Sequence, residues 1–419
     1  MTFRQASPEY EEVELRILDG DSSGVSIREW SEYSFNSHFL TPADAFSFSV
    51  GQEDLTIEAY NAMVPGAKVG LFINSHQQCT GYIDSIERSA SRDGGVEWRI
   101  EGRDIMGPIV DGSVDPKLQF KPGMKLSELI LKALEPYGWA PTFEDDNDAN
   151  LNVMTGQKRG TRTSKKGKTA KNAGVGQLRP HPQEGTFAFI SRISQRLGLW
   201  IWPSAKGDKI IVSTPNFTNN SGSYSIRRRF DGVGNNVLSG SVTVDLSDQP
   251  TIIVADGFSG GGQFGKSRIK AVMANPFIEV KGKPSSAFIA EIQEKYKGIV
   301  VVKPPFTPPS TMTVPRPKIV YFHDEESHTQ EQLENYVLRE LSLLTRKFVS
   351  AKYTVAGHFV INDEEETLPW AVDTIVEVDD EVGGLKENMW VLSRTFTKGA
   401  GSRGTKTSLE LIKLHTLEF

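Results

Sequence analysis

Short segments in which apolar and polar residues alternate are the feature that most limits how this chain can fold. Gly, Pro or Asn turns separate five of them near the start of the sequence: EEVELRIL (11–18), FSFSV (46–50), KVGLFIN (68–74), CTGYIDSIERS (79–89) and GVEWRIEGRD (95–104). Alternation with a period of two places the apolar side chains on one face of a strand. Short, evenly spaced strands of this kind predict a small β-barrel or β-sandwich.

Three segments change to a helical period. The first is GMKLSELILKALEPYGW (123–139), whose apolar residues fall on one stripe and whose Gly138 can end the helix. The second follows Glu184 and carries Phe189, Ile193 and Leu197 on one stripe, before Gly198 and a hairpin in LWIWPSAKGDKIIVS. The longest helix is expected to begin at a capping box formed by Ser327 and Gln330 and to run to about Val349.

A chain of 419 residues is too long for one ordinary hydrophobic core. The predicted fold class is a β-rich, multidomain α+β protein with two barrel-like β-domains and peripheral α/β domains. We expect four units: a barrel-like domain at 1–115, a peripheral α/β domain at 116–230, a middle β/α domain at 231–326, and a helix plus a second β-domain at 327–419. The middle unit contains a proline-rich connector at 301–317, which cannot be helical.

Composition excludes several classes of protein. A net charge of −6 argues against a general nucleic-acid binder, because phosphate contacts need clustered Lys and Arg. The single cysteine, Cys79, excludes an internal disulfide framework and a CxxC-type zinc site. The opening MTFRQASPEYEEV lacks the order of a signal peptide, and no apolar run approaches the roughly 18 residues that span a bilayer. We therefore expect synthesis in a cytoplasm and no membrane insertion.

Residues 149–183 contain no Asp or Glu and are rich in Gly, Thr, Ser and Asn, so we expect a long loop with little to bury. The loop carries eight basic residues: Lys158, Arg159, Arg162, Lys165, Lys166, Lys168, Lys171 and Arg179. Such a segment can bind an acidic protein surface or DNA, and the binding would weaken with salt. The alternative is a solvated excursion without a partner.

The segment GGGQFGKS (260–267) fits the P-loop pattern, in which backbone N–H groups hold phosphates, Lys266 reaches the β and γ oxygens and Ser267 binds Mg²⁺. A P-loop needs a strand before it and a helix after it. Pro276 interrupts the following RIKAVMANP, and the surroundings predict a β-meander. A glycine-rich hairpin tip is therefore favoured, with a nucleotide-binding assembly factor kept as an alternative.

No other pattern predicts a catalytic, metal or cofactor residue. The acidic run DDNDAN (145–150) starts like a calcium loop, but Leu151 stands where glycine is required and Gln157 where glutamate is required. The seven histidines form no H-E-x-x-H motif, and there is no G-x-S-x-G elbow. Carboxylates that act on glycans need only meet in space, so a peptidoglycan hydrolase remains a second alternative.

Several segments, taken in order, resemble phage tail baseplate hub proteins of the phage Mu type, which are related in fold to the phage T4 baseplate hub. Three segments resemble the first domain of these hub proteins: FSFSVGQEDL (46–55), PGAKVGLFINSHQQCTGYIDSI (65–86) and GGVEWRIEGRDIMGPIVDGSV (94–114). The resemblance continues in NNVLSGSVTVDLSDQPTIIVADG (235–257) and AKYTVAGH (351–358), and it closes in residues 369–414.

The resemblance implies a structural virion protein without enzymatic activity or a cofactor. It would be a homotrimeric hub in the tail baseplate, assembled in the host cytoplasm, that joins the six-fold tail tube to the three-fold central spike. Residues 1–115 and 350–419 would build a pseudo-six-fold ring around a channel for genome ejection. The implied partners are the tail tube protein, the central spike protein, wedge or other outer baseplate proteins, and, in transit, the tape-measure protein and phage DNA.

Two sets of residues acquire roles in this interpretation. Arg103, Asp104 and Asp111, which lie among small and apolar residues, would form structural ion pairs or hydrogen bonds at a corner of the first β-domain. The basic loop would point outward and bind an outer baseplate protein in preference to DNA.

Overall fold

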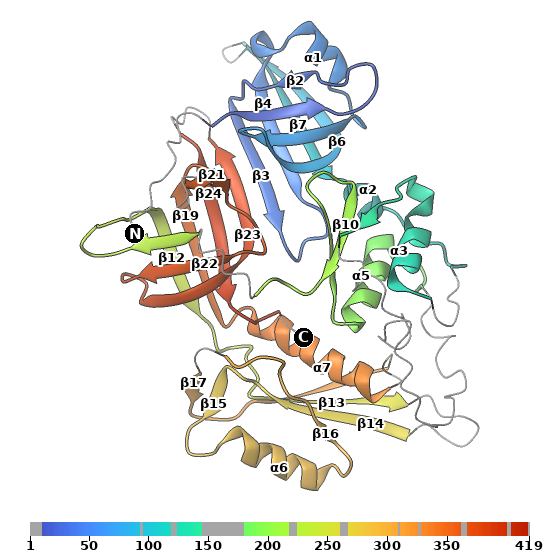
Figure 1. The fold of residues 1–419 in the computed structure, drawn as a ribbon, viewed down its shortest axis with the longest axis vertical. Coiled ribbons are helices and arrows are strands. Elements are labelled where there is room, and N and C mark those ends of the chain that lie inside the picture. The colour runs from blue at the N-terminus through green and yellow to red at the C-terminus, as the bar shows by residue number, and fades with distance from the viewer. Residues whose placement is uncertain are drawn as a thin grey trace.

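The computed structural model describes residues 11–92, 95–118, 124–144, 180–217, 224–259, 267–308, 311–325, 327, 329–361, 367–399 and 404–417. The basic residues between 158 and 179, the acidic run 145–150 and residues 260–266 lie outside these ranges. Four groups of elements can be distinguished (Figure 1).

The first sheet module forms the blue part of Figure 1. Its strands are β1 (Val13–Ile17), β2 (Ser26–Ile27), β3 (Glu32–His38), β4 (Ala45–Gly51), β5 (Lys68–Ile73), β6 (His76–Ser91) and β7 (Gly95–Asp104). They follow the segments that alternation predicted, and the buried residues fall on one face. In β3, for example, Tyr33, Phe35 and Ser37 are buried, whereas the residues between them are not. A 3-10 turn η2 (Gln52–Asp54) and a short helix α1 (Ile57–Ala62) lie between β4 and β5.

The second sheet module combines two distant parts of the sequence. Its strands are β11 (Ser225–Arg228), β12 (Val237–Val244), β19 (Val349–Ala356), β22 (Ile375–Asp380), β23 (Leu385–Lys398) and β24 (Lys406–Lys413), with a separate hairpin of β20 (Phe359–Ile361) and β21 (Thr367–Pro369). The pairing of β3 with β23 joins both modules into one sheet in the order β12-β19-β24-β23-β3-β4-β7-β6-β5-β1-β2. One hydrophobic core extends across the join.

The predicted barrels are not closed in the described part of the chain. The strand order starts at β12 and ends at β2 without returning, so each module is an open, strongly curved sheet rather than a barrel. One edge of β3 pairs with β4 of the first module. Its other edge pairs with β23 of the second module instead of closing the first module on itself.

A small α/β unit covers the corner after β7. It contains α2 (Gly107–Asp111), α3 (Leu126–Leu134), η3 (Glu135–Tyr137), β8 (Thr142–Phe143), α5 (Thr186–Arg196), β9 (Trp200–Pro203) and β10 (Lys209–Ser213). Both predicted helices are confirmed, with Gly138 and Gly198 at positive φ after them, where L-residues are strained. The hairpin β9–β10 reaches back to the sheet, where the Thr80 hydroxyl donates to the Ala205 carbonyl over 3.0 Å.

The fourth group is a sheet with a helix on each face. Its strands are β13 (Ile252–Ser259), β14 (Ser267–Ala274), β16 (Val300–Val301) and β18 (Ile319–Asp324), covered by α7 (Gln330–Thr345) and α6 (Ser285–Lys295), with a small pair β15 (Ile278–Val280) and β17 (Met312–Val314) beside it. Alternate residues of β13 face the two helices, Ile253 and Ala255 toward α7 and Ile252 and Val254 toward α6. Burial on both faces explains the continuous apolar run IIVA.

The helix α7 differs from its prediction in two ways. Its cap is Thr329, whose hydroxyl accepts from the Gln332 N–H over 3.2 Å, whereas the Ser327 hydroxyl donates to Asp324. The helix also ends at Thr345, so Val349 is already the first residue of β19. Because α7 packs on β13 and β14, it joins the core of the middle unit, although the sequence grouped it with the second β-domain.

Close backbone contact between β6 and β7 makes Gly102 a sensitive position. A Cβ atom there would lie 2.3 Å from the Tyr82 carbonyl oxygen and 2.4 Å from Phe46 Cζ. We predict that Gly102→Ala lowers the free energy of unfolding by about 2 to 3 kcal/mol, because strand and ring must move apart. Urea unfolding would measure the change, with Ser85→Ala on the exposed part of β6 as the control. Equal stability of the two variants would contradict the close packing.

Candidate functional site

The two sheet modules have the same strand topology. In each, the first of four strands pairs with the fourth, the fourth with the third and the third with the second, giving β4-β7-β6-β5 and β19-β24-β23-β22. A preceding strand, β3 or β12, pairs with the first strand. One difference is the outermost partner, since β1 runs antiparallel to β5 but β11 runs parallel to β22.

The register of pairing is also shared. Seven consecutive pairs join β4 to β7 and seven join β19 to β24. The long strands β6 and β23 each pair three times with the last strand, skip one residue in a bulge, and then continue. The matching pairs before the bulge are Gly81–Asp104, Tyr82–Arg103 and Ile83–Gly102 in one module, and Met389–Lys413, Trp390–Ile412 and Val391–Leu411 in the other. A bulge at the same place in both sheets indicates one structural plan used twice.

The bulged residue has opposite chemistry in the two modules. In the first, Asp84 is bulged and accepts from Arg103 Nε over 2.7 Å, and Arg103 also contacts Asp111 with an N–O distance of 2.6 Å. In the second, the equivalent residues Leu392 and Ile412 share a hydrophobic cluster. The same backbone thus carries an ion-pair corner on one side and an apolar contact on the other.

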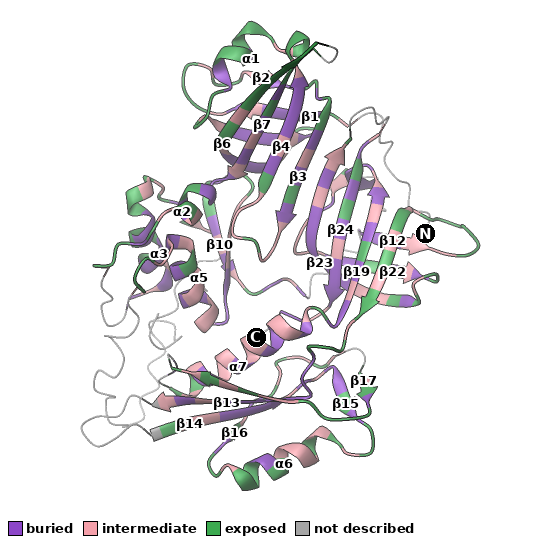
Figure 2. Ribbon diagram, turned by 180° about the vertical axis from the view of Figure 1, so that it is seen from behind, coloured by how far each residue is buried: buried purple, intermediate pink, exposed green. Residues whose placement is uncertain are grey.

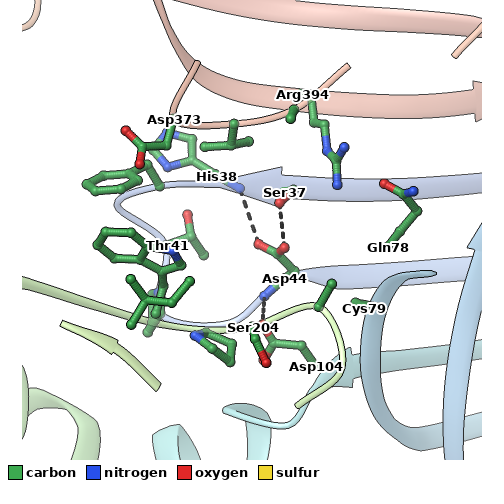
Figure 3. A pocket seen from close by; sticks show the side chains of 18 of the residues that line it. Ser37, His38, Thr41, Asp44, Gln78, Cys79, Asp104, Ser204, Asp373 and Arg394 are labelled. Atoms are coloured by element: carbon green, nitrogen blue, oxygen red, sulfur yellow. Dashed lines mark hydrogen bonds between the residues drawn. The ribbon is translucent and has the colours of Figure 1, made fainter. Parts of the chain in front are cut away.

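A cavity of about 250 Å³ lies where the two modules meet the β9–β10 hairpin (Figure 3). Asp44, after the β3–β4 corner, stands at its centre. Its carboxylate accepts from the Ser37 hydroxyl over 2.5 Å and from the His38 N–H over 3.3 Å. Its own N–H donates to Asp104 Oδ2 over 3.0 Å, and Asp104 Oδ1 accepts from the Met106 N–H over 2.8 Å.

Burial controls the charges in this joint. Burial raises the pKa of the Asp44 carboxyl, and burial next to Asp44 raises the pKa of Asp104 to about 8. Arg394, on β23, is buried too, and its positive charge lowers the pKa of Asp44 against the effect of burial. Its guanidinium also donates to the Trp370 carbonyl and lies 4.6 Å from the Phe396 ring centre. The joint therefore holds an acid pair and one arginine in place of separate, hydrated charges.

An aromatic wedge fixes the hairpin against the joint. Phe39, at the β3–β4 corner, lies among three tryptophans with ring-centre distances of 5.7, 5.0 and 4.9 Å: Trp200, Trp202 and Trp390. Trp200 and Trp202 come from β9 and Trp390 from β23, so one side chain connects three groups of elements. Aromatic contacts of this kind add stability beyond the area that they bury.

A second buried polar contact crosses between the modules. The Tyr33 hydroxyl of β3 lies 2.7 Å from His358 Nε2, and His358 Nδ1 lies 3.1 Å from the Thr407 hydroxyl. Burial lowers the pKa of His358 to about 3, so the imidazole is neutral at physiological pH. A neutral ring has one donor and one acceptor nitrogen, and both have partners here.

Protein groups already occupy hydrogen-bonding positions of the acid pair. The carboxylate oxygens of Asp44 and Asp104 accept hydrogen bonds from the protein itself, and burial raises the pKa of the Cys79 thiol, which keeps it protonated. Within the described ranges, no three His, Cys, Asp or Glu residues are grouped so that they could hold a metal ion. No helix in those ranges is long and apolar enough to cross a membrane.

The context of the P-loop pattern is wrong for nucleotide binding. The strands before and after it, β13 and β14, pair antiparallel with Ser259 opposite Ser267. A strand therefore follows the segment where a P-loop requires a helix. Residues 260–266 themselves lie outside the described residues, as do the basic residues Lys158, Arg159, Arg162, Lys165, Lys166, Lys168, Lys171 and Arg179.

The predicted corner residues separate into two sets. Arg103 and Asp111 form an exposed ion pair, in which the Arg103 guanidinium lowers the pKa of Asp111. Asp104 points the other way, into the buried joint. The sequence pattern did not reveal Asp44, Phe39 or Arg394, because each sits in an ordinary strand or turn and meets the others only through the β3–β23 pairing.

Comparison with known proteins identifies the class. Residues 13–104, which are β1 to β7, match the family described as Mu phage baseplate assembly protein GpP-like, N-terminal. The first sheet module is therefore similar to this baseplate family, which confirms the resemblance drawn from the sequence.

Two solved structures share the fold of nearly the whole chain. A prophage MuSo2 43 kDa tail protein from Shewanella oneidensis is 17% identical with a TM-score of 0.66, over 97% of this chain and 99% of that one. A tail protein from Neisseria meningitidis MC58 is 20% identical with a TM-score of 0.64, over 97% of this chain and 98% of that one. No curated protein matches the sequence.

The raised pKa of Asp104 predicts how stability depends on pH. Folded Asp104 retains its proton up to about pH 8, whereas the ordinary pKa of an aspartate is 3.8. The stabilisation linked to this proton is complete below the lower value and is lost as pH rises through the higher one. The free energy of unfolding should therefore fall from about pH 5 to about pH 8 in urea titrations, and less steeply in Asp104→Asn.

Asp111→Asn is the matched control. The pKa of Asp111 is lowered, so its carboxyl does not titrate in this range. Its pH slope should equal that of the unaltered chain. An unchanged slope in Asp104→Asn would show that this carboxyl does not hold a proton in the folded joint.

Proposed function

We propose that this chain is the hub of a phage tail baseplate, a structural protein that forms a homotrimeric ring between the six-fold tail tube and the three-fold central spike. The observation that carries the proposal is the repeated sheet module, with its shared topology, register and bulge. Three chains would present six modules with the same strand topology, and these six modules would match the six-fold symmetry of the tube. The ring itself would keep three-fold symmetry.

The chemical differences between the modules fit this role. Equivalent positions carry Asp84 and Arg103 in one module and Leu392 and Ile412 in the other. A tube protein would meet six similar backbones, whereas a spike or an outer protein would meet only three copies of each distinctive surface. The matched family and the similar structures are baseplate and tail proteins, which supports a place in the virion tail.

The remaining units would lie outside the ring. The α/β unit and the α6–sheet–α7 layers project from one side of the continuous sheet in Figure 1. Wedge or other outer baseplate proteins are the proposed partners there, with the basic loop at 149–183 binding an acidic face in a salt-sensitive way. The tape-measure protein and phage DNA would pass through the centre of the ring.

The buried joint favours this function over a spike-associated hydrolase. Its paired carboxylates, Asp44 and Asp104, accept hydrogen bonds from neighbouring protein groups, and a cavity of about 250 Å³ is below the usual volume of a ligand site. A zymogram of the purified chain on peptidoglycan should show no clearing.

Sedimentation tests the trimer. The purified chain, alone or with the spike protein, should sediment at about three times 46.4 kDa at micromolar concentration. The physical reason is that each chain supplies two of six equivalent modules. A monomer under both conditions would contradict the proposal.

A further inference from the structure

Two of the edges that lack a partner strand in the described part of the chain lie at matching places of the repeated module. One is the outer edge of β12, and the other is residues 85–91 of β6, since β5 pairs only with the first half of that strand. Their equivalents in the other module, β3 and β23, pair with each other. The contact that joins the modules within one chain therefore has two unpaired equivalents, one on β12 at the end of the sheet and one on the second half of β6.

We propose that β12 of one chain pairs antiparallel with residues 86–89 of β6 in the next chain and repeats this part of the β3–β23 contact. The pairing stops before Gly240, whose carbonyl accepts from Arg228 Nη1 over 2.7 Å within the chain. This inference rests on the proposed ring and names its interface. The register follows from the equivalent positions: Val242 corresponds to Phe35 and Val244 to Ser37, as Ile86 corresponds to Arg394 and Arg88 to Phe396. The expected pairs are Ile86–Val244, Glu87–Thr243, Arg88–Val242 and Ser89–Ser241.

Main-chain hydrogen bonds support this register. The Asp245 N–H donates to the Phe348 carbonyl across to β19 over 2.9 Å. Donors alternate along a strand, so the main-chain groups of Val244 and Val242 point away from β19. In β3 the Phe39 N–H donates to the Leu392 carbonyl of β23 over 3.0 Å, which turns Ser37 and Phe35 toward β23. The outward positions of β12 are thus the equivalents of the positions that β3 uses.

The composition of β12 fits a paired edge better than a solvated one. Its sequence VLSGSVTV has no charge and no proline, the two devices by which free edges normally resist pairing. Leu238 is 57% exposed and Val244 is 52% exposed. Figure 2 shows β12 at the outer edge of the second module, far from the first. No described strand of the same chain reaches this edge, so we assign its partner to another chain.

The side chains match on both faces. Ile86 and Val242 already pack against the hydrophobic core, so Ile86 would meet Val244 and Arg88 would meet Val242 on the core side. Glu87 and Thr243 are exposed and would face each other on the opposite side. No like charges oppose each other in this register, and the Ile86–Val244 pair covers apolar surface that one chain leaves open.

Cysteine cross-linking tests the register in the full chain. Glu87→Cys with Thr243→Cys should form disulfides between chains, because non-hydrogen-bonded partners lie at about 4.5 Å between Cα atoms. Glu87→Cys with Ser239→Cys shifts one partner by about 13 Å along the strand and should cross-link at least about tenfold less. Asn36→Cys with Thr395→Cys is the matched positive control, since that equivalent pair should close within one chain.

A proline tests the hydrogen bonds separately. Val244→Pro removes an N–H that β19 does not use, so the monomer should stay folded while the ring population falls about tenfold or more. Val244→Thr keeps the N–H and should assemble normally. Circular dichroism would report folding and sedimentation the assembly.

The outcomes separate this inference from the ring itself. A trimer without cross-linking at 87 and 243, or one that Val244→Pro leaves intact, overturns the pairing and leaves the hub proposal standing. Cross-linking at 87 and 243 in species other than trimers supports the pairing and contradicts the trimer. No cross-linking in a chain that stays monomeric overturns both.

Discussion

The antiparallel pairing of β3 with β23 is the contact on which the rest of the structure depends. It runs from Ser393 opposite His38 to Lys398 opposite Tyr33 and makes one sheet from the two modules through strands that lie more than 350 residues apart in sequence. Phe35 and Phe396 meet across it with their ring centres 6.3 Å apart. Asp44, Arg394 and the Phe39 wedge take their positions from this join, because each belongs to β23 or to the corner next to β3. Asp104 reaches the same site from the end of β7.

Buried polar groups at the join make its register specific. A slip by one residue would turn Arg394 and Phe396 to the opposite face of the sheet. It would also separate Arg394 from the buried Asp44 carboxyl, whose pKa its positive charge lowers. The cost of such a slip explains how a protein can reuse one sheet plan twice and still fix the relation between the two copies, which a ring with a defined symmetry requires.

Local elements were largely predictable from the sequence, but their long-range pairing was not. Period-two alternation located β4, β5, β6 and β7, and the apolar stripe with Gly138 located α3, because both signals are local. The predicted cap of α7 was wrong because the Ser327 hydroxyl donates to Asp324. Thr329, two residues closer to the helix, is the cap instead. Closed barrels were expected because strand spacing does not reveal which edge pairs with a distant strand.

The candidate site was predictable only in part for the same reason. GRD at 102–104 stood out in the sequence, yet Arg103 and Asp104 point to opposite sides of β7 and serve different contacts. Asp44 and Arg394 have no local signal at all, since the cause of their meeting is the sheet order. The sequence also gives no sign of the repeated module, because equivalent residues differ, as Asp84 and Leu392 do. The repeat becomes clear only from the strand register and from the matching bulges in β6 and β23.

The most direct test of the account is an image of the purified assembly, by electron cryomicroscopy, at a resolution that separates strands. The account predicts a ring in which six sheet modules lie at one radius around a central channel, alternating between the two kinds, with three α6–sheet–α7 layers outside. A particle in which the two modules of each chain lie at different radii, or in which only three modules line the channel, would contradict it.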